Sequence, residues 1–263
     1  MIPNRCLFIF LGEMRFSLVS YLAVRSAAEV NRPEELVLYY EHLPTGPWWD
    51  RARPFFTDLV KVDPPRRIGA AELVHPAHQA DVLRLEMLLK DGGVYLDLDM
   101  VSVRPLTPLL GERFVLGQEG REQDGDVPVL CNGVILAERD ADFGRAWLDG
   151  FDPATSLWQG FRSRGRDEYW NEISCQYPAH LATLHPDQIT IAPYDAFHWP
   201  MWHAEHLERL FLGSGDEFPN AYCHHLWQSL SWEPYLSKLT PDYIREVDTN
   251  FNLMVRAYVE ETP

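Results

Sequence analysis

Apolar and polar positions over the first forty residues predict a strand, a helix and a second strand. Residues 7–11 are continuously apolar and end at Gly12, which is typical of a buried strand. Residues 17–30 carry apolar side chains at helical spacing, and residues 35–40 predict the second strand. This β-α-β start favours an α/β fold with a central, mostly parallel sheet flanked by helices, whose ligand site lies at the carboxyl ends of the strands.

The middle of the chain continues this alternation of helices and strands. Residues 76–90 predict a helix that Gly92 and Gly93 close, and residues 94–101 predict a strand. The acidic, glycine-rich segment 117–128 predicts a surface loop. The remaining elements that the pattern predicts are strands at 59–62 and 129–137 and a helix at 142–148.

Composition and charge narrow the class of protein. The 263 residues are 46% hydrophobic, and 39 acidic against 23 basic residues give a net charge of −16, which disfavours nucleic acid and anionic membranes as partners. The four cysteines lie far apart in the sequence, so we expect reduced, buried thiols. The apolar run near the amino terminus is too short for a signal peptide or a membrane span, and we expect a soluble, cytoplasmic protein.

Two aspartates near the end of the strand predicted at 94–101 form a candidate site. Alternation along that strand sends Asp97 and Asp99 to the same side. Repulsion and desolvation make such a pair costly unless a cation compensates it, and a divalent metal that carries a phosphate ester is a common partner. The alternative is that both aspartates begin a solvated loop.

A second charged pair lies on the helix predicted at 76–90. Asp81 and Arg84 are three residues apart and share one face, which the helix brings back over the same sheet edge. An arginine beside two carboxylates can neutralise them, or can bind a phosphate or a sugar hydroxyl. The alternative is a surface ion pair of little energetic value.

These positions resemble the sequence pattern of the DxD sugar-transferase superfamily. This group includes α-1,4-galactosyltransferase-like enzymes, initiating mannosyltransferases and clostridial glucosylating toxins. The motif positions are Ala80, Asp81, Arg84, Leu88, Gly92, Gly93 and the string Val94-Tyr95-Leu96-Asp97-Leu98-Asp99. Three other parts of the chain are also similar to the family, namely residues 2–12, residues 131–137, and the set Tyr222, His225, Leu226, Trp227, Ser231 and Trp232.

The resemblance implies a GT-A fold and an activity. It implies a single domain over 1–263, with a nucleotide-sugar-binding part at about 1–110 and a part for the acceptor, the metal and the diphosphate at about 111–263. The implied enzyme is a retaining, metal-dependent glycosyltransferase that uses Mn²⁺ or Mg²⁺. It would move a hexose to an acceptor hydroxyl from a nucleotide diphosphate sugar, with a UDP-sugar favoured over GDP-mannose.

The resemblance also implies roles for individual residues. The metal ligands would be Asp97, Asp99 and His225. His224 is adjacent, and only the spacing to Trp227 favours His225. The catalytic residues would be Asp97, Asp99 and Asn132, with Asn132 near the anomeric centre. The donor-binding residues would be Phe10, Leu11, Asp81, Arg84, Asp97, Asn132, Ser231 and Trp232. No nucleophile is assigned.

Two other functions remain open at this point. Residues 94–101 also fit the first motif of haloacid-dehalogenase-like phosphatases, with Asp97 as nucleophile and Asp99 as acid, although Lys238 is the only lysine downstream. A non-catalytic protein that binds a sugar nucleotide or a carbohydrate is the second alternative. Aromatic residues between 158 and 203 could line an acceptor cleft or fill the core. We expect the acidic residues Glu119, Glu122, Asp124 and Asp126 to form a solvated loop rather than a lid.

Overall fold

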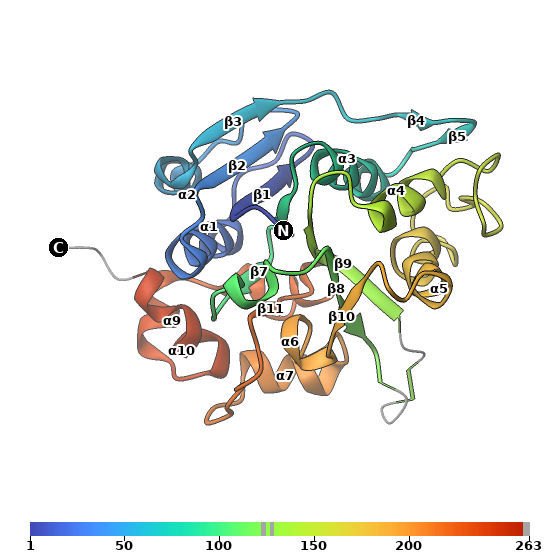
Figure 1. The fold of residues 1–263 in the computed structure, drawn as a ribbon. Helices are drawn as coiled ribbons and strands as arrows, with labels where there is room; N and C mark the ends of the chain where they lie inside the picture. Colours follow the sequence, from blue (N-terminus) through green and yellow to red (C-terminus); the bar gives the residue numbers. More distant parts are fainter. Residues whose placement is uncertain (122–124, 127–128, 260–263) are drawn as a thin grey trace.

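The computed structural model describes residues 1–121, 125–126 and 129–259, and its centre is a seven-stranded sheet (Figure 1). The strand order is β10-β8-β9-β6-β1-β2-β3. Six of these strands are parallel to one another, and β9 runs opposite to its neighbours β6 and β8. The seven strands are β1 (Arg5–Phe10), β2 (Glu35–Tyr40), β3 (Asp58–Lys61), β6 (Gly93–Leu96), β8 (Phe114–Glu119), β9 (Val129–Ala137) and β10 (Thr190–Ala192).

Four short strands lie outside this sheet. The pair β4 (Arg67–Ile68) and β5 (Ala71–Glu72) forms a hairpin. The other pair, β7 (Met100–Ser102) and β11 (Cys223–His225), is antiparallel and joins the middle of the chain to its carboxyl-terminal part.

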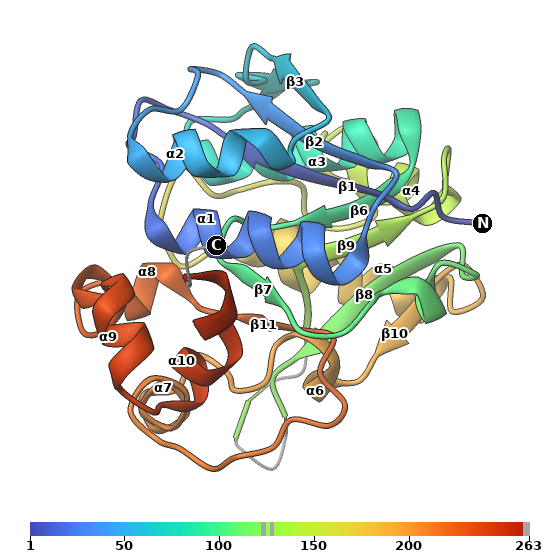
Figure 2. The same ribbon diagram turned by 90° about the vertical axis from the view of Figure 1, so that its left-hand side faces the viewer.

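Helices cover both faces of the large sheet. One face packs against α1 (Leu18–Ser26), α2 (Pro47–Ala52) and three carboxyl-terminal helices that lie together in Figure 2. These three are α7 (Ala204–Phe211), α9 (Pro241–Glu246) and α10 (Asn250–Val255). The opposite face packs against α3 (Pro76–Asp91), α4 (Asp142–Asp149) and α5 (Tyr177–Leu184). Two short helices, α6 (Tyr194–Phe197) and α8 (Gln228–Ser231), complete the set of α-helices in the described residues.

Strand β1 shows why the sheet is buried on both faces. Its side chains alternate, so that Phe8 and Phe10 enter the core under α1 while Leu7 and Ile9 enter the core under α3. This burial explains the continuous apolar run in the sequence, because a central parallel strand has no solvent-facing side.

The glycine pair after α3 turns the chain sharply into β6. Gly93 has a φ of +120°, and a Cβ at this position would lie 2.5 Å from the carbonyl oxygen of Arg5. Only glycine combines this backbone conformation with so close an approach of β1. The turn sets where β6 begins and therefore where its carboxyl end presents the following residues.

The predicted α/β architecture with a mostly parallel, helix-flanked sheet is confirmed, with two local corrections. The single strand expected at 94–101 is wrong, because β6 stops at Leu96 and β7 belongs to another sheet. The loop expected at 117–128 begins too early, because β8 continues through Glu119 by pairing with β9. Residues 122–124 and 127–128 lie outside the described residues. The division of the chain near residue 110 stays a prediction.

Candidate active site at the carboxyl end of β6

The DxD residues lie in a turn directly after β6. The amide of Asp97 donates a hydrogen bond to the carbonyl of Gly133 (2.9 Å), and the amide of Met100 donates to the carbonyl of Asp97 (3.0 Å). The alternation argument for Asp97 and Asp99 is therefore wrong, because the backbone has left the extended conformation. The two carboxylates still lie close together, since the turn folds both toward the edge of the sheet.

The β7–β11 pair brings a histidine from the carboxyl-terminal part to this turn. His225 pairs with Met100 in register, and its Nε2 lies 3.4 Å from Oδ1 of Asp99. Asp99 is held further by the amide of Gln228, which donates to Oδ2 at 2.8 Å. Ligand-capable atoms of Asp97, Asp99 and His225 all lie within 4.8 Å of one another. We call these three residues the carboxylate cluster.

The adjacent His224 points elsewhere. Its Nδ1 donates a hydrogen bond to the carbonyl of Trp199 (2.8 Å), and its ring lies edge-on to Phe218. Burial lowers the pKa of His224 to about 4. The structure thus brings His225, and not His224, to the aspartates.

The pKa values of the two aspartates in the carboxylate cluster are shifted in opposite directions. Burial raises the pKa of Asp97, and the neighbouring Asp99 adds to this effect against the lowering by Arg84. Burial would also raise the pKa of Asp99, but the positive charge of His225 and its hydrogen bonds outweigh it, so the pKa of Asp99 is lowered. Burial opposes protonation of His225, yet the carboxylates around it raise its pKa. A cation between these groups relieves the repulsion that Asp97 experiences.

A buried charge network lies beside the carboxylate cluster. Arg84 is 5% exposed, and its guanidinium lies 3.3 Å from Asp81 and 3.4 Å from Asp97. It also donates to the carbonyl of Asn132 at 2.7 Å, while the amide side chain of Asn132 donates to Asp81 at 2.7 Å. The alternative of a surface ion pair is wrong, because Asp81 is also 5% exposed. We call Asp81, Arg84 and Asn132 the Arg84 network.

Two further residues support the Arg84 network: Tyr95, to which the sequence motif gave no role, and His78, which was not singled out from the sequence. Tyr95 donates its hydroxyl proton to Asp97, and its ring lies under the Arg84 guanidinium at 4.2 Å. The signal for Tyr95 is its place in the motif string 94–99, two residues before Asp97. His78 lies with Nδ1 3.4 Å from Asp81 and with Nε2 3.1 Å from the hydroxyl of Ser163, and no sequence signal connects residues 78 and 163.

The other expected donor-binding residues, Phe10, Leu11, Ser231 and Trp232, have different surroundings from one another. Phe10 ends β1 and Leu11 follows it, at the carboxyl edge of the parallel strands. Ser231 is fully buried and donates its hydroxyl proton to the carbonyl of Leu226, so its side chain stabilises the turn after His225. Trp232 is 36% exposed. Their contacts with a donor stay predictions.

The aromatic and acidic residues of the second half of the chain are partly buried and partly exposed. Trp170 and Trp202 are exposed, whereas Trp158 is half-buried and donates to Glu172. The loop expectation for Glu119 is wrong, because this residue lies in β8. Asp126 contacts His203 at 2.9 Å. Glu122 and Asp124 lie outside the described residues.

The donor atoms of the carboxylate cluster fit a divalent metal ion. Two carboxylates and one imidazole suit a first-row ion such as Mn²⁺, and Mg²⁺ would rely on the carboxylate oxygens. Burial is the largest cause of the raised pKa of Asp97 and the charge of Asp99 adds to it, so a bound cation would favour the ionised form of this carboxyl.

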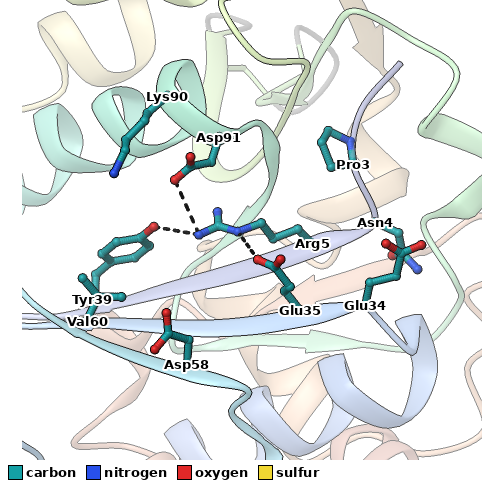
Figure 3. A pocket seen from close by; sticks show the side chains of 10 residues that line it. All are labelled: Pro3, Asn4, Arg5, Glu34, Glu35, Tyr39, Asp58, Val60, Lys90 and Asp91. Carbon is teal, nitrogen blue, oxygen red and sulfur yellow. Dashed lines mark hydrogen bonds and ion pairs between the residues drawn. The ribbon is translucent and has the colours of Figure 1, made fainter.

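A cavity of about 430 Å³ lies at the opposite edge of the sheet (Figure 3). It surrounds Arg5, Glu35 and Asp58, which are the first residues of β1, β2 and β3. Because the carboxylate cluster follows the carboxyl end of β6, this cavity is separate from the candidate active site.

In the part of the chain that the structure describes, we find no helix with the length and apolar character that a membrane crossing requires.

Comparisons with known proteins relate this chain to glycosyltransferases. Residues 22–115 match the family model described as "Glycosyltransferase sugar-binding region containing DXD motif", and this range includes Asp81, Arg84, Asp97 and Asp99. Glucan organizing enzyme 1 of Cryptococcus neoformans var. grubii is 37% identical over 246 residues, which cover 91% of this chain and 64% of that protein. This chain therefore spans less than two thirds of that relative.

Solved structures show the same fold. The apo form of the glycosyltransferase GlyE of Streptococcus pneumoniae TIGR4 is 15% identical, with a TM-score of 0.53, and the match covers 98% of this chain and 61% of that one. A second GlyE structure gives a TM-score of 0.51 at 14% identity, with 97% of this chain and 61% of that one covered. The family match favours a transferase over the phosphatase alternative. Residues 22–115 thus match the glycosyltransferase sugar-binding region that contains the DXD motif, and the chain as a whole has the GT-A fold of the solved GlyE structures.

Proposed function

We propose that this protein transfers a hexose from a nucleotide diphosphate sugar to an acceptor hydroxyl, with retention of configuration and with a divalent metal ion, preferably Mn²⁺. The donor is a UDP-sugar or, as the second choice, GDP-mannose. The observation that carries the proposal is the carboxylate cluster of Asp97, Asp99 and His225 at the carboxyl end of β6, beside the buried Arg84 network.

Asp97, Asp99 and His225 would hold the metal ion. When bound, this ion stabilises the negative charge that grows on the diphosphate as the glycosidic bond breaks. Asp99 is positioned for this role by the amide of Gln228 and by His225, so its carboxylate is fixed before the donor arrives. Such a fixed arrangement lowers the reorganisation needed in the transition state.

The Arg84 network would orient the donor sugar. Asp81 accepts hydrogen bonds within the network, yet a carboxylate has lone pairs for a sugar hydroxyl as well. Arg84 joins Asp81 to Asp97, so that the sugar and metal parts of the site keep a fixed distance. Asn132 bridges Asp81 and Arg84, which supports its proposed place near the anomeric centre.

We propose a glucan as the acceptor class. The basis is the name of the curated relative, Glucan organizing enzyme 1. The exposed rings of Trp170 and Trp202 are of the kind that stack on sugars. The buried free cysteines suit a reducing compartment, which supports a cytoplasmic location as part of the proposal.

The test compares wild type with Asp99→Asn and with the control Asp142→Asn, whose side chain is 63% exposed on α4. We expect Mn²⁺-dependent release of UDP from UDP-glucose with a glucan acceptor, reduced by about 10²-fold or more in Asp99→Asn and unchanged in the control. NMR of the first product should show a retained anomeric configuration. Donor binding without turnover by the wild type would favour the non-catalytic alternative, and equal rates in both variants would refute the assigned metal site.

A further inference from the structure

A second group of metal-ligating side chains lies next to the carboxylate cluster. Ligand-capable atoms of Cys131, His198 and His225 all lie within 4.8 Å of one another, and all three residues are buried. We call these three residues the thiol cluster. It shares His225 with the carboxylate cluster, but its other two donors are a sulfur and a nitrogen.

The fold places His198 beside Cys131 through a glycine. Gly117 of β8 is the register partner of Cys131 in β9. The His198 ring packs directly over Gly117, where a Cβ would lie 2.8 Å from its Nε2. The missing side chain at residue 117 therefore leaves the space in which His198 reaches the sheet surface beside the thiol.

Gly133, two residues further along β9, opens the other side of the thiol cluster. A Cβ on Gly133 would lie 3.2 Å from Oδ2 of Asp97, 3.5 Å from Cε1 of His225 and 3.7 Å from Sγ of Cys131. The two clusters thus meet above this glycine, with His225 between them.

The imidazole groups of the thiol cluster lack hydrogen-bond partners. His198 is fully buried, and neither of its ring nitrogens has a partner among the described residues. Nδ1 of His225 is also buried and without a partner there. A buried polar atom without a partner costs about 1–3 kcal/mol, so three of them close together call for an explanation such as a bound ion.

We propose that Cys131, His198 and His225 form a zinc site, distinct from the site of the carboxylate cluster. Sulfur and imidazole donors are the ligands that Zn²⁺ prefers, whereas carboxylates suit Mn²⁺ and Mg²⁺. Binding releases the thiol proton of Cys131, so that a thiolate and two imidazoles surround the ion. Burial raises the pKa of Glu119, whose side chain hydrogen-bonds Cys131, and a bound ion would favour its ionised form and thus a second balancing negative charge.

The shared histidine gives the zinc site a consequence. A neutral imidazole ligates one metal ion at a time, so His225 cannot serve both clusters together. Zn²⁺ at the thiol cluster would bind Nδ1 of His225, which has no partner among the described residues, and this leaves Nε2 protonated beside Asp99 and without a lone pair for Mn²⁺. Mn²⁺ binding at the carboxylate cluster would then be weaker. This inference concerns metal binding alone and does not depend on the proposed transfer reaction.

The test uses Co²⁺ as a spectroscopic substitute for Zn²⁺, added to the full chain after removal of metals with a chelator. A thiolate bound to Co²⁺ gives a charge-transfer band in the near ultraviolet that carboxylates do not give. We expect this band in wild type, in Asp99→Asn and in the control Cys6→Ala, which removes a buried free cysteine of β1. We expect its loss in Cys131→Ala and in His198→Gln, and its disappearance from wild type when Zn²⁺ displaces Co²⁺.

Two further measurements keep the proposal testable without any variant. X-ray absorption of the wild type loaded with Zn²⁺ should show one sulfur neighbour and imidazole nitrogens. Electron paramagnetic resonance should show that Zn²⁺ weakens Mn²⁺ binding at least about tenfold, the usual scale for the loss of a ligand's support. Absence of the charge-transfer band in folded wild type, its survival in Cys131→Ala, or a zinc shell of oxygen and nitrogen alone would overturn the zinc site.

Discussion

Replacement of Arg84 by methionine tests whether the Arg84 network stabilises the fold. The arginine side chain is 6% exposed and lies against Asp81, Asp97 and the carbonyl of Asn132. Methionine keeps an unbranched, apolar side chain over the Tyr95 ring but removes every hydrogen-bond donor. The change therefore leaves the buried Asp81 and the partly exposed Asp97 without their arginine.

The expected cost follows from this burial. Loss of one partner from a buried ion pair costs about 3–5 kcal/mol, and we take about 4 kcal/mol for Arg84→Met. For a chain of this size that corresponds to a fall of roughly 8–16 °C in melting temperature. The matched control is Arg113→Met, whose side chain is 59% exposed and pairs with Glu138 and Asp142. An exposed pair of this kind contributes at most about 1 kcal/mol.

The assay is urea unfolding of both variants at pH 7 in the presence of a chelator, followed by a double-variant cycle with Asp81→Asn. Removal of the Asp81 charge should make the loss of Arg84 less costly, because one buried carboxylate no longer needs a cation. If Arg84→Met unfolds within about 1 kcal/mol of the Arg113→Met control, or if the cycle shows no coupling, the reasoning about the network is refuted.

Three other changes have defined outcomes. Gly93→Ala places a Cβ 2.5 Å from the Arg5 carbonyl oxygen at a φ of +120°. We expect it to lower the free energy of unfolding by about 3 kcal/mol, and an unchanged urea midpoint would contradict the argument that only glycine fits this turn. Tyr95→Phe removes the hydrogen bond to Asp97 and should cost about 1–2 kcal/mol in the same assay; equal stability would show that this bond contributes nothing. His224 has a pKa lowered to about 4 by burial, so below about pH 6.5 the unfolded chain binds a proton that the folded chain does not. The free energy of unfolding should therefore fall by about 3 kcal/mol as the pH drops from 6.5 to 4, and His224→Gln should flatten this part of the profile. If the wild type and His224→Gln lose stability in parallel over this range, His224 is not the group responsible.

Local patterns predicted most of the sheet from the sequence. The apolar runs at 7–11 and 35–40 match β1 and β2 closely, because strands buried on both faces have no polar positions to obscure the pattern. The helix expected at 76–90 matches α3, since Pro76 begins it and Gly92 ends it. Such signals lie within the element that they predict.

The site needed more than local patterns. Asp97 and Asp99 were identified from their chemistry, although the geometry inferred for them was wrong, because the end of β6 depends on pairing with β9. The position of His225 opposite Met100 depends on a pairing across more than a hundred residues, which periodicity does not encode. The position of His198 beside Cys131 has the same origin, since it depends on Gly117 in a distant strand.

Because β7 pairs with β11, the carboxylate cluster can be completed only late in the synthesis of the chain. Two of its donors precede residue 100 and the third is residue 225, so a nascent chain that has emerged only through β9 holds the aspartates without the histidine. The complete ligand set exists only after the carboxyl-terminal part has emerged and β11 has paired. Metal affinity at this cluster would therefore report that β11 has emerged and has paired with β7.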